Sequence, residues 1–186
     1  LGLTKNYLYP KKIVQETLNN IKDNINVEEI NIENEIVEEK HFSKETNKII
    51  TKEENDLMKF GTKVHEIFEL LDFRNIDLSL VDNKFIRNKV EKFLSNDLLK
   101  NISNANIYKE YEFIYNKDNN EYHGIIDLML EYDNHIDIID YKLKSITDEN
   151  YIKQLNGYKE YIEKISNKEV STYLYSILDE KVLQIN

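Results

Sequence analysis

The sequence predicts an α/β fold in which a mixed β-sheet is flanked by helices. Apolar residues recur at helical spacing from residue 51 to residue 71, strand-like runs follow between residues 107 and 144, and helical spacing returns after residue 148. Shorter strand-like runs close the chain. The predicted order is α-α-β-β-β-α-β, in which the helices cover the faces of one sheet.

The first fifty residues differ in composition from the remainder. Residues 10–25 suit a helix with Pro10 near its first turn. Residues 26–50 are acidic and rich in asparagine, and we interpret them as a linker or an extended arm. The chain is therefore divided into an N-terminal helix with an acidic segment, residues 1–50, and one folded domain, residues 51–186.

Two helices open the predicted domain. The first covers residues 51–71, where Thr51 and Glu54 resemble a capping box. The second covers residues 82–99. The apolar positions of the first helix lie on one face and are Leu57, Phe60, Val64, Ile67, Phe68 and Leu71.

Three strands come next. Residues 107–115 predict the first, which ends at the polar run 116–120. The other two form a hairpin around Asp133 and Asn134, because an Asp-Asn pair suits a two-residue turn. One helix and two strands follow, over residues 148–165, 169–177 and 181–185. The apolar face of that helix comprises Tyr151, Leu155, Tyr158, Ile162 and Ile165.

This hairpin brings two acidic residues together. If Tyr132 and His135 close its turn, Asp127 lies directly opposite Asp140. Opposed side chains have Cβ atoms about 5 Å apart, where like charges repel. Taken singly, either residue would be an ordinary solvated aspartate. Together they favour a hard cation such as Mg²⁺ or Mn²⁺, which would offset the repulsion. The residues expected to share their face are Ile125, Met129 and Ile138.

Lys142 and His65 are the next candidates. Lys142 has the side-chain parity of Asp140 and therefore points to the same face. It would orient or deprotonate a water molecule, or stabilise charge on a phosphate; the alternative is a plain salt bridge to Asp140. His65 overlies Gly61 on its helix, where no side chain blocks approach. It is either a ligand or a histidine satisfied by a structural partner.

Polar residues on two other elements complete the set. Gln154 stands on an apolar helix face, one turn before Tyr158, and a buried amide there needs hydrogen-bond partners. It either caps backbone groups or reaches into the cleft beside Lys142. Glu110 and Glu112 share one parity on the first strand, and one of them would complete a metal shell.

Composition excludes several classes of protein. The chain has no cysteine, so disulfides, thiol catalysis and cysteine-held zinc or iron–sulfur sites are absent, and a reducing cytoplasmic location fits. The net charge of −10 argues against a protein that coats polyanions in general, but not against a local groove or a metal site. No apolar run approaches the ~20 residues of a membrane span, and no P-loop motif occurs. Because the chain begins with Leu1 rather than Met, we expect a segment of a longer protein.

Five short motifs in order resemble the RecB-type branch of the PD-(D/E)XK nuclease superfamily. They are Gly61-Thr62-Lys63-Val64-His65, Glu110-x-x-Phe113, Gly124-x-x-Asp127, Asp140-Tyr141-Lys142 and Gln154-x-x-x-Tyr158. The run His41 to Ser43, followed by GTKVHEIFELLDF, is most similar to the C-terminal nuclease domain of AddA-type helicase–nuclease subunits. Related AddB nucleases typically hold an iron–sulfur cluster, for which this chain has no cysteine ligands.

The resemblance implies a restriction-endonuclease-like core with extra N-terminal helices, and phosphodiester hydrolysis of DNA with Mg²⁺ or Mn²⁺. In such enzymes the metal would be held by His65, Asp127, Asp140 and the backbone carbonyl of Tyr141. Lys142 would position the attacking water and offset developing charge.

The same resemblance implies roles for Gln154 and Tyr158, which would orient Lys142 or the nucleic-acid backbone. It also implies an exonuclease module in double-strand-break repair, a helicase domain in the same full-length chain and an AddB-like partner subunit. The acidic composition departs from this family and favours an alternative, a catalytically silent nuclease fold that binds DNA or a partner subunit. A restriction-like or CRISPR-associated nuclease is a third possibility.

Overall fold

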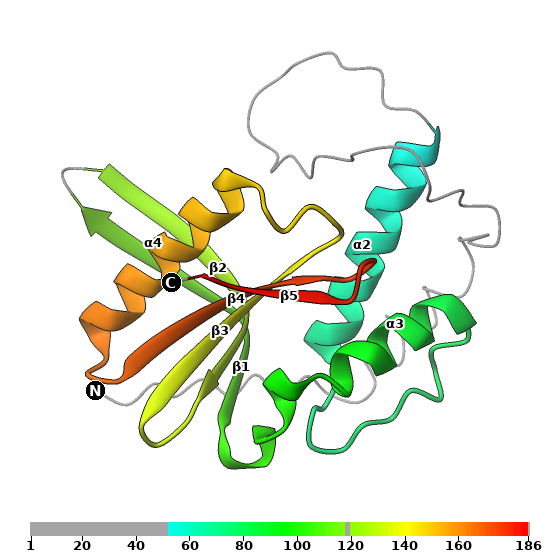
Figure 1. Ribbon diagram of the computed structural model, residues 1–186, viewed down its shortest axis with the longest axis horizontal. Coiled ribbons are helices and arrows are strands. Elements are labelled where there is room, and N and C mark those ends of the chain that lie inside the picture. The colour runs from blue at the N-terminus through cyan, green and yellow to red at the C-terminus, as the bar shows by residue number, and fades with distance from the viewer. Residues whose placement is uncertain (1–51, 118–119, 186) are drawn as a thin grey trace.

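The computed structural model of the protein describes residues 52–117 and 120–185 (Figure 1). Its helices are α2 (Lys52–Leu70), α3 (Lys84–Leu94) and α4 (Glu149–Ile165), with the 3₁₀ turns η3 (Asp97–Leu99) and η4 (Ile102–Asn104) after α3. Its strands are β1 (Asn106–Lys117), β2 (Asn120–Glu131), β3 (His135–Lys142), β4 (Glu169–Ser176) and β5 (Lys181–Ile185). The helix predicted at residues 10–25, the acidic segment 26–50 and the capping box at Thr51 lie outside the described residues.

The strands form one mixed sheet in the order β1-β2-β3-β4-β5. The pairs β1–β2, β2–β3 and β4–β5 are antiparallel, whereas β3 and β4 are parallel and are joined through α4. A parallel pair needs such a crossover, because a tight turn can only join antiparallel neighbours. The predicted α/β fold with a mixed sheet flanked by helices is confirmed, and it is compatible with a restriction-endonuclease-like core.

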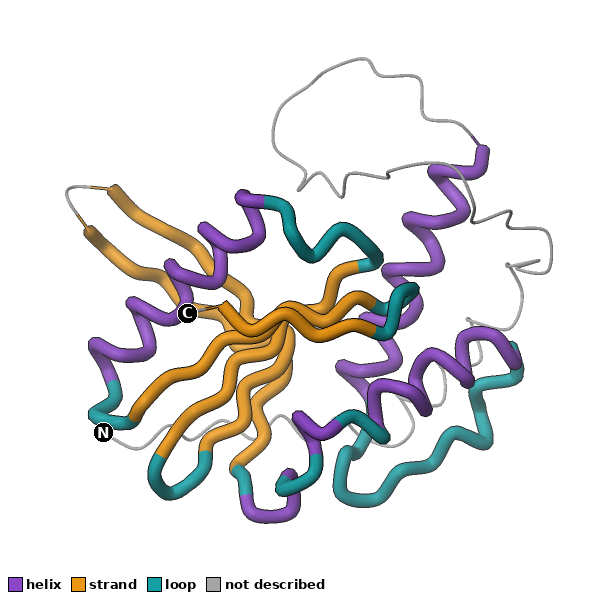
Figure 2. Tube along the Cα trace, viewed as in Figure 1, coloured by secondary structure: helices purple, strands orange, loops and turns teal. Residues whose placement is uncertain are grey.

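Two apolar layers hold the helices against the sheet, with α4 on the opposite side of the strands from α2 and α3 (Figures 1 and 2). The first layer buries Phe60, Val64, Ile67 and Phe68 of α2 and Ile86, Val90 and Phe93 of α3 against Leu128, Leu130, Ile139 and Tyr141. The second layer buries Tyr151, Leu155, Tyr158 and Ile162 of α4 against Ile126, Met129, Ile138 and Leu174. Ile165, predicted for the same face, is 50% exposed because α4 ends there.

The helix predicted over residues 82–99 is shorter than expected. The side chain of Asn83 accepts hydrogen bonds from the backbone N–H groups of Phe85 and Ile86, which starts α3. A second asparagine, Asn96, accepts from the N–H of Leu98 and starts the separate turn η3. Local capping by Asn96 therefore divides the predicted helix in two.

The β1–β2 hairpin is longer than predicted and projects beyond the other strands (Figure 1). Its register runs from Asn106↔Glu131 to Lys117↔Asn120, so Asn116, Lys117 and Asn120 of the predicted polar end belong to the strands. Backbone pairing continues there although the side chains of the pair Asn116 and Glu121 are exposed to solvent.

Candidate metal centre

The predicted two-residue turn at Asp133 and Asn134 is confirmed, since the N–H of Tyr132 donates to the carbonyl of His135 at 2.9 Å. The β2–β3 register then runs from Glu131↔Ile136 to Leu128↔Ile139 and stops.

Beyond that point β2 parts from β3. The backbone N–H of Tyr141 donates to the carboxylate Oδ2 of Asp127 at 2.7 Å, where a continued ladder would have supplied a backbone carbonyl. Asp127 and Asp140 therefore lie just beyond the last pair of the ladder, Leu128 and Ile139, and are not themselves paired. A side-chain acceptor replaces a strand contact at the point where the strands separate.

The β1–β2 ladder is interrupted at one level, and the side-chain direction changes there on both strands. Glu110 has φ 47°, in the left-handed region, and the pair Glu110–Asp127 is missing from a register that holds Lys109↔Leu128 and Tyr111↔Ile126 on either side. Glu110 and Lys109 both turn toward α2, since Lys109 Nζ donates to the carbonyl of Leu71 at the end of that helix. Such irregularities re-aim side chains that strict alternation would place on opposite faces.

This interruption of the β1–β2 ladder makes one prediction wrong. Asp127 was expected to share a face with Ile125, Met129 and Ile138, but it approaches His65 on α2. Met129 and Ile138 belong to the apolar layer beneath α4, and Ile125 is 48% exposed.

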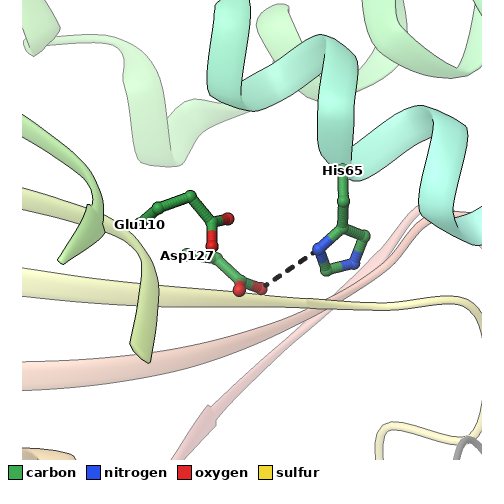
Figure 3. A group of neighbouring side chains, drawn as sticks. All are labelled: His65, Glu110 and Asp127. Atoms are coloured by element: carbon green, nitrogen blue, oxygen red, sulfur yellow. Dashed lines mark ion pairs between the residues drawn. The ribbon is translucent and has the colours of Figure 1, made fainter. Parts of the chain in front are cut away.

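Three predicted candidates, from α2, β1 and β2, meet at this point. His65, Glu110 and Asp127 each offer a nitrogen or oxygen atom, and these atoms all lie within 4.8 Å of one another (Figure 3). His65 Nδ1 is 3.8 Å from Asp127 Oδ2. All three residues are only partly buried, so solvent and a ligand can reach them. One imidazole and two carboxylates fit a divalent cation such as Mn²⁺ or Mg²⁺.

Glu110 and Glu112, which were predicted as alternatives, differ in position along β1. Glu112 is exposed and lies outside the cluster, whereas Glu110 is inside it. Burial raises the pKa of Glu110 to about 7, and the charges of Asp127, Glu69 and Asp140 act in the same direction. Several carboxylates therefore converge on one place, which favours a cation there.

Asp140 and Lys142 form a buried ion pair beside the cluster. Lys142 Nζ lies 2.8 Å from Asp140 Oδ2, and the two residues are 4% and 2% exposed. Burial raises the pKa of Asp140 to about 6, with the charge of Asp127 acting in the same direction and that of Lys142 opposing it. Lys142 Nζ also lies 4.6 Å from the ring centroid of Tyr151. The lysine is thus held by a carboxylate and an aromatic face.

Gln154 and Tyr158 are in direct contact. Gln154 Nε2 donates to the Tyr158 hydroxyl at 2.6 Å, so the partner of the amide is a side chain and not the backbone. Burial raises the pKa of Tyr158 to about 12, and the charge of Asp140 adds to this shift. The hydroxyl therefore stays protonated near the acidic cluster.

Gly124 makes room for Tyr158. A Cβ at Gly124 would lie 2.3 Å from Phe113 Cζ and 2.9 Å from Tyr158 Cε1. The glycine of the predicted Gly124-x-x-Asp127 motif is therefore required by the close approach of two rings.

The backbone of Tyr141 faces the gap between β2 and β3. The carbonyl of its neighbour Lys142 accepts from Ile177 N–H on the β4 side, and successive residues of a strand point their backbone groups in opposite directions. The Tyr141 carbonyl therefore points away from β4, on the side of Asp127, as its N–H does. Its role as a metal ligand stays a prediction.

Sequence reasoning missed two neighbours of the cluster. Glu69 lies four residues after His65 on α2, so the two share a helix face, and its charge acts on Glu110. That i,i+4 spacing could have indicated it. Tyr151 was predicted only as part of an apolar face, and the pattern carried no signal of its contact with Lys142.

Within the part of the chain that the structure describes, no helix has both the length and the apolar character needed to cross a membrane.

The sequence of the chain is similar to curated proteins that share one name. No protein-family model matches it. Three curated relatives bear the name of an ATP-dependent helicase/nuclease subunit. The chain is 27% identical over 95% of its length to the one from Clostridioides difficile (strain 630), 29% identical over 67% to that of Clostridium beijerinckii, and 28% identical over 62% to that of Clostridium acetobutylicum. It spans only 18%, 14% and 13% of the length of these relatives. These similarities make the chain a distant relative of one part of such ATP-dependent helicase/nuclease proteins.

Proposed function

We propose that this chain is a metal-dependent DNA nuclease that hydrolyses phosphodiester bonds with Mg²⁺ or Mn²⁺. The observation that carries the proposal is the convergence of His65, Glu110 and Asp127 within 4.8 Å, beside the buried pair of Asp140 and Lys142. The relatives named as helicase/nuclease subunits support the same chemistry.

The metal would be held by His65, Glu110 and Asp127, with Asp140 and the carbonyl of Tyr141 as the further ligands that the family resemblance implies. A divalent cation bound to these groups would acidify a water molecule and polarise the scissile phosphate. The two carboxylates would supply negative charge and the imidazole a neutral nitrogen ligand, and Asp127 is itself oriented by the N–H of Tyr141.

Lys142 would place a positive charge against the substrate. Asp140 fixes its ammonium group at 2.8 Å, and the ring of Tyr151 limits its position on another side. An ammonium group has three N–H donors, so one can serve Asp140 while others reach a phosphate oxygen or the attacking water. Charge held in place before the reaction needs no reorganisation when the phosphate becomes more negative.

Tyr158 would act as a positioning residue. Its hydroxyl accepts a hydrogen bond from Gln154, and the nearby charge of Asp140 contributes to raising its pKa. We propose that the pair orients the nucleic-acid backbone or the Asp140–Lys142 pair.

The wider proposal is an exonuclease module of an AddA-type helicase–nuclease in double-strand-break repair. A helicase domain in the same full-length chain, a cytoplasmic location and an AddB-like partner subunit belong to this proposal. Its support is that the curated relatives carry both activities in their name, while the chain spans 18% or less of them.

Cleavage of labelled linear and circular DNA by the 186-residue chain, with Mg²⁺ or Mn²⁺, tests the activity. We expect linear DNA to be degraded from its ends, and Asp140→Ala and Lys142→Ala to lose activity by about 10³-fold. Lys142→Ala removes the cation that would face the phosphate, and Asp140→Ala removes the carboxylate that holds this cation and would help to hold the metal. The exposed Lys181→Ala, on β5, is the matched lysine control and should keep full activity. Undiminished cleavage by both Asp140→Ala and Lys142→Ala would contradict the proposal.

Calorimetric titration with Mn²⁺ tests the cluster without DNA. Glu110→Gln should weaken binding by about tenfold or more, since it removes a charged oxygen ligand. Glu112→Gln, two residues away on the same strand and exposed, should bind as the unaltered chain does. Mn²⁺ binding without any cleavage would favour the binding-only module instead.

A further inference from the structure

A cavity with mixed polar and apolar lining lies at the opposite end of β3 from Asp140 and Lys142. Its volume is about 470 Å³, within the range of small-ligand sites. It is lined by Asn96, Asp97, Leu98, Asn101, Tyr132, His135, Asp137, Tyr173 and Val182. His135 and Asp137 stand at the beginning of β3, about 15–25 Å along the strand from Lys142. The cavity is therefore separate from the metal centre.

Aromatic rings form part of its wall. The rings of Tyr132 and His135 are stacked, with centroids 4.4 Å apart and planes inclined by 12°. Burial raises the pKa of Tyr132 and of Tyr173, and the charge of the Asp137 carboxylate raises both further. A carboxylate thus lies near two phenol groups at the cavity.

The charge of the lining is negative. Two aspartates, Asp97 and Asp137, line the cavity, and among the described residues no lysine or arginine joins them. The imidazole of His135 approaches Asp137, with Nε2 3.7 Å from Oδ2, beyond a good hydrogen bond. A phosphate or carboxylate ligand would be repelled here, whereas a cation would be attracted.

We propose that this cavity binds the guanidinium group of an arginine side chain presented by a partner polypeptide. A guanidinium is planar, stacks on aromatic rings and carries five N–H donors that match carboxylate and amide oxygens. Asp137 and Asp97 supply the carboxylates, and Asn101 adds an amide oxygen. The net charge of −10 on the chain favours a basic partner surface.

The test is an NMR titration of the ¹⁵N-labelled 186-residue chain with N-acetyl-arginine amide, without metal or DNA. We expect saturable shifts of the amides of Tyr132, His135, Asp137 and Tyr173. The neutral isostere N-acetyl-citrulline amide should cause none, because it keeps the shape and removes the charge. Spermidine should bind at least roughly tenfold more weakly, because its ammonium groups do not stack as a planar cation does.

Two acid variants complete the test. Asp137→Asn should weaken binding of the arginine amide by roughly tenfold or more, and the exposed Asp97→Asn provides a second reading that does not disturb buried structure. The control is Asp133→Asn, an exposed acid in the adjoining turn that does not line the cavity, and it should bind as the unaltered chain does. The proposal is overturned by an absence of saturable shifts, by equal binding of citrulline amide or spermidine, or by unchanged affinity in both Asp137→Asn and Asp97→Asn. Because neither metal nor DNA is present, failure of the nuclease proposal would leave this result intact.

Discussion

The two halves of β2 differ in how they are paired. Residues 128–131 pair with β1 on one side and β3 on the other, and Leu128, Met129 and Leu130 are buried. Residues 120–126 pair with β1 alone in the described ladders, and Asp127, between the two halves, belongs to neither ladder.

The difference shows how the site is made. Where both neighbours are present, backbone groups pair on both sides of the strand and side chains alternate between two apolar layers. Where β2 no longer pairs with β3, the N–H of Tyr141 bonds to the Asp127 carboxylate instead, and the irregular backbone at Glu110 brings a second carboxylate toward it. Acidic side chains are thus collected where the ladder has ended.

The largest difference in stability should be found between substitutions at two neighbouring residues, Asp127 and Leu128, where β2 stops pairing with β3. Leu128 is fully buried, so Leu128→Ala should lower the free energy of unfolding by about 3 kcal/mol. Asp127→Asn should change that free energy by less than about 1 kcal/mol, because the amide oxygen can still accept from Tyr141 N–H and one repulsive charge is removed. Urea unfolding in the absence of metal measures both.

The same two substitutions should have the opposite order of effects on metal binding. Asp127→Asn should weaken Mn²⁺ binding by about 100-fold. Under conditions in which Leu128→Ala is folded, it should bind Mn²⁺ as tightly as the unaltered chain does. If the two variants lost stability and metal affinity in the same proportion, the two halves of β2 would not have separate roles.

A smaller effect is expected at Gly124, in the half of β2 that has left β3. Gly124→Ala should cost about 2 kcal/mol, because its Cβ would overlap Phe113 and that ring is stacked on Tyr161 at 4.0 Å and cannot easily retreat. Thermal unfolding measures the loss.

The matched control is Gly157→Ala on α4. Gly157 is exposed and a Cβ there meets no atom within 4 Å. The substitution should raise stability by about 0.5–1 kcal/mol, because alanine favours the helix. Equal and small effects at both glycines would mean that Phe113 and Tyr158 can move aside without cost.

Regular structure was predictable from the sequence because it follows periodicity. The hairpin turn at Asp133 and Asn134, the helix α4 and the order of strands all agree with the pattern of apolar residues. The proximity of Asp127 to Asp140 followed from the register of the turn.

The interruption of the β1–β2 ladder could not be predicted in the same way. A glutamate seldom adopts positive φ, so nothing in the sequence at Glu110 marks the break in alternation that turns it to the same side as Lys109. Strict alternation placed Asp127 beneath α4 with Met129, and only the irregular backbone directs it toward His65. Tertiary contacts at the end of a ladder, rather than local propensity, decide these directions.

The smallest expected effect is a change of stability with pH in the metal-free chain. The folded pKa values of Glu110 and Asp140 are raised to about 7 and about 6, above the ordinary values of 4.5 and 3.8. Between about pH 4.5 and pH 7 the folded chain therefore holds protons that the unfolded chain has lost, so stability falls as the pH rises through this range. We expect a loss of about 1 kcal/mol between about pH 5 and pH 8, since solvent screens the partly exposed Glu110.

Urea unfolding at a series of pH values measures this slope, and Glu110→Gln should flatten it. The control Glu112→Gln removes the same charge from the same strand but outside the cluster, so it should leave the slope as it is. A general repulsion among the excess acidic residues would be relieved equally by the two variants. Only a difference between them assigns the pH dependence to the carboxylates gathered where β2 leaves β3.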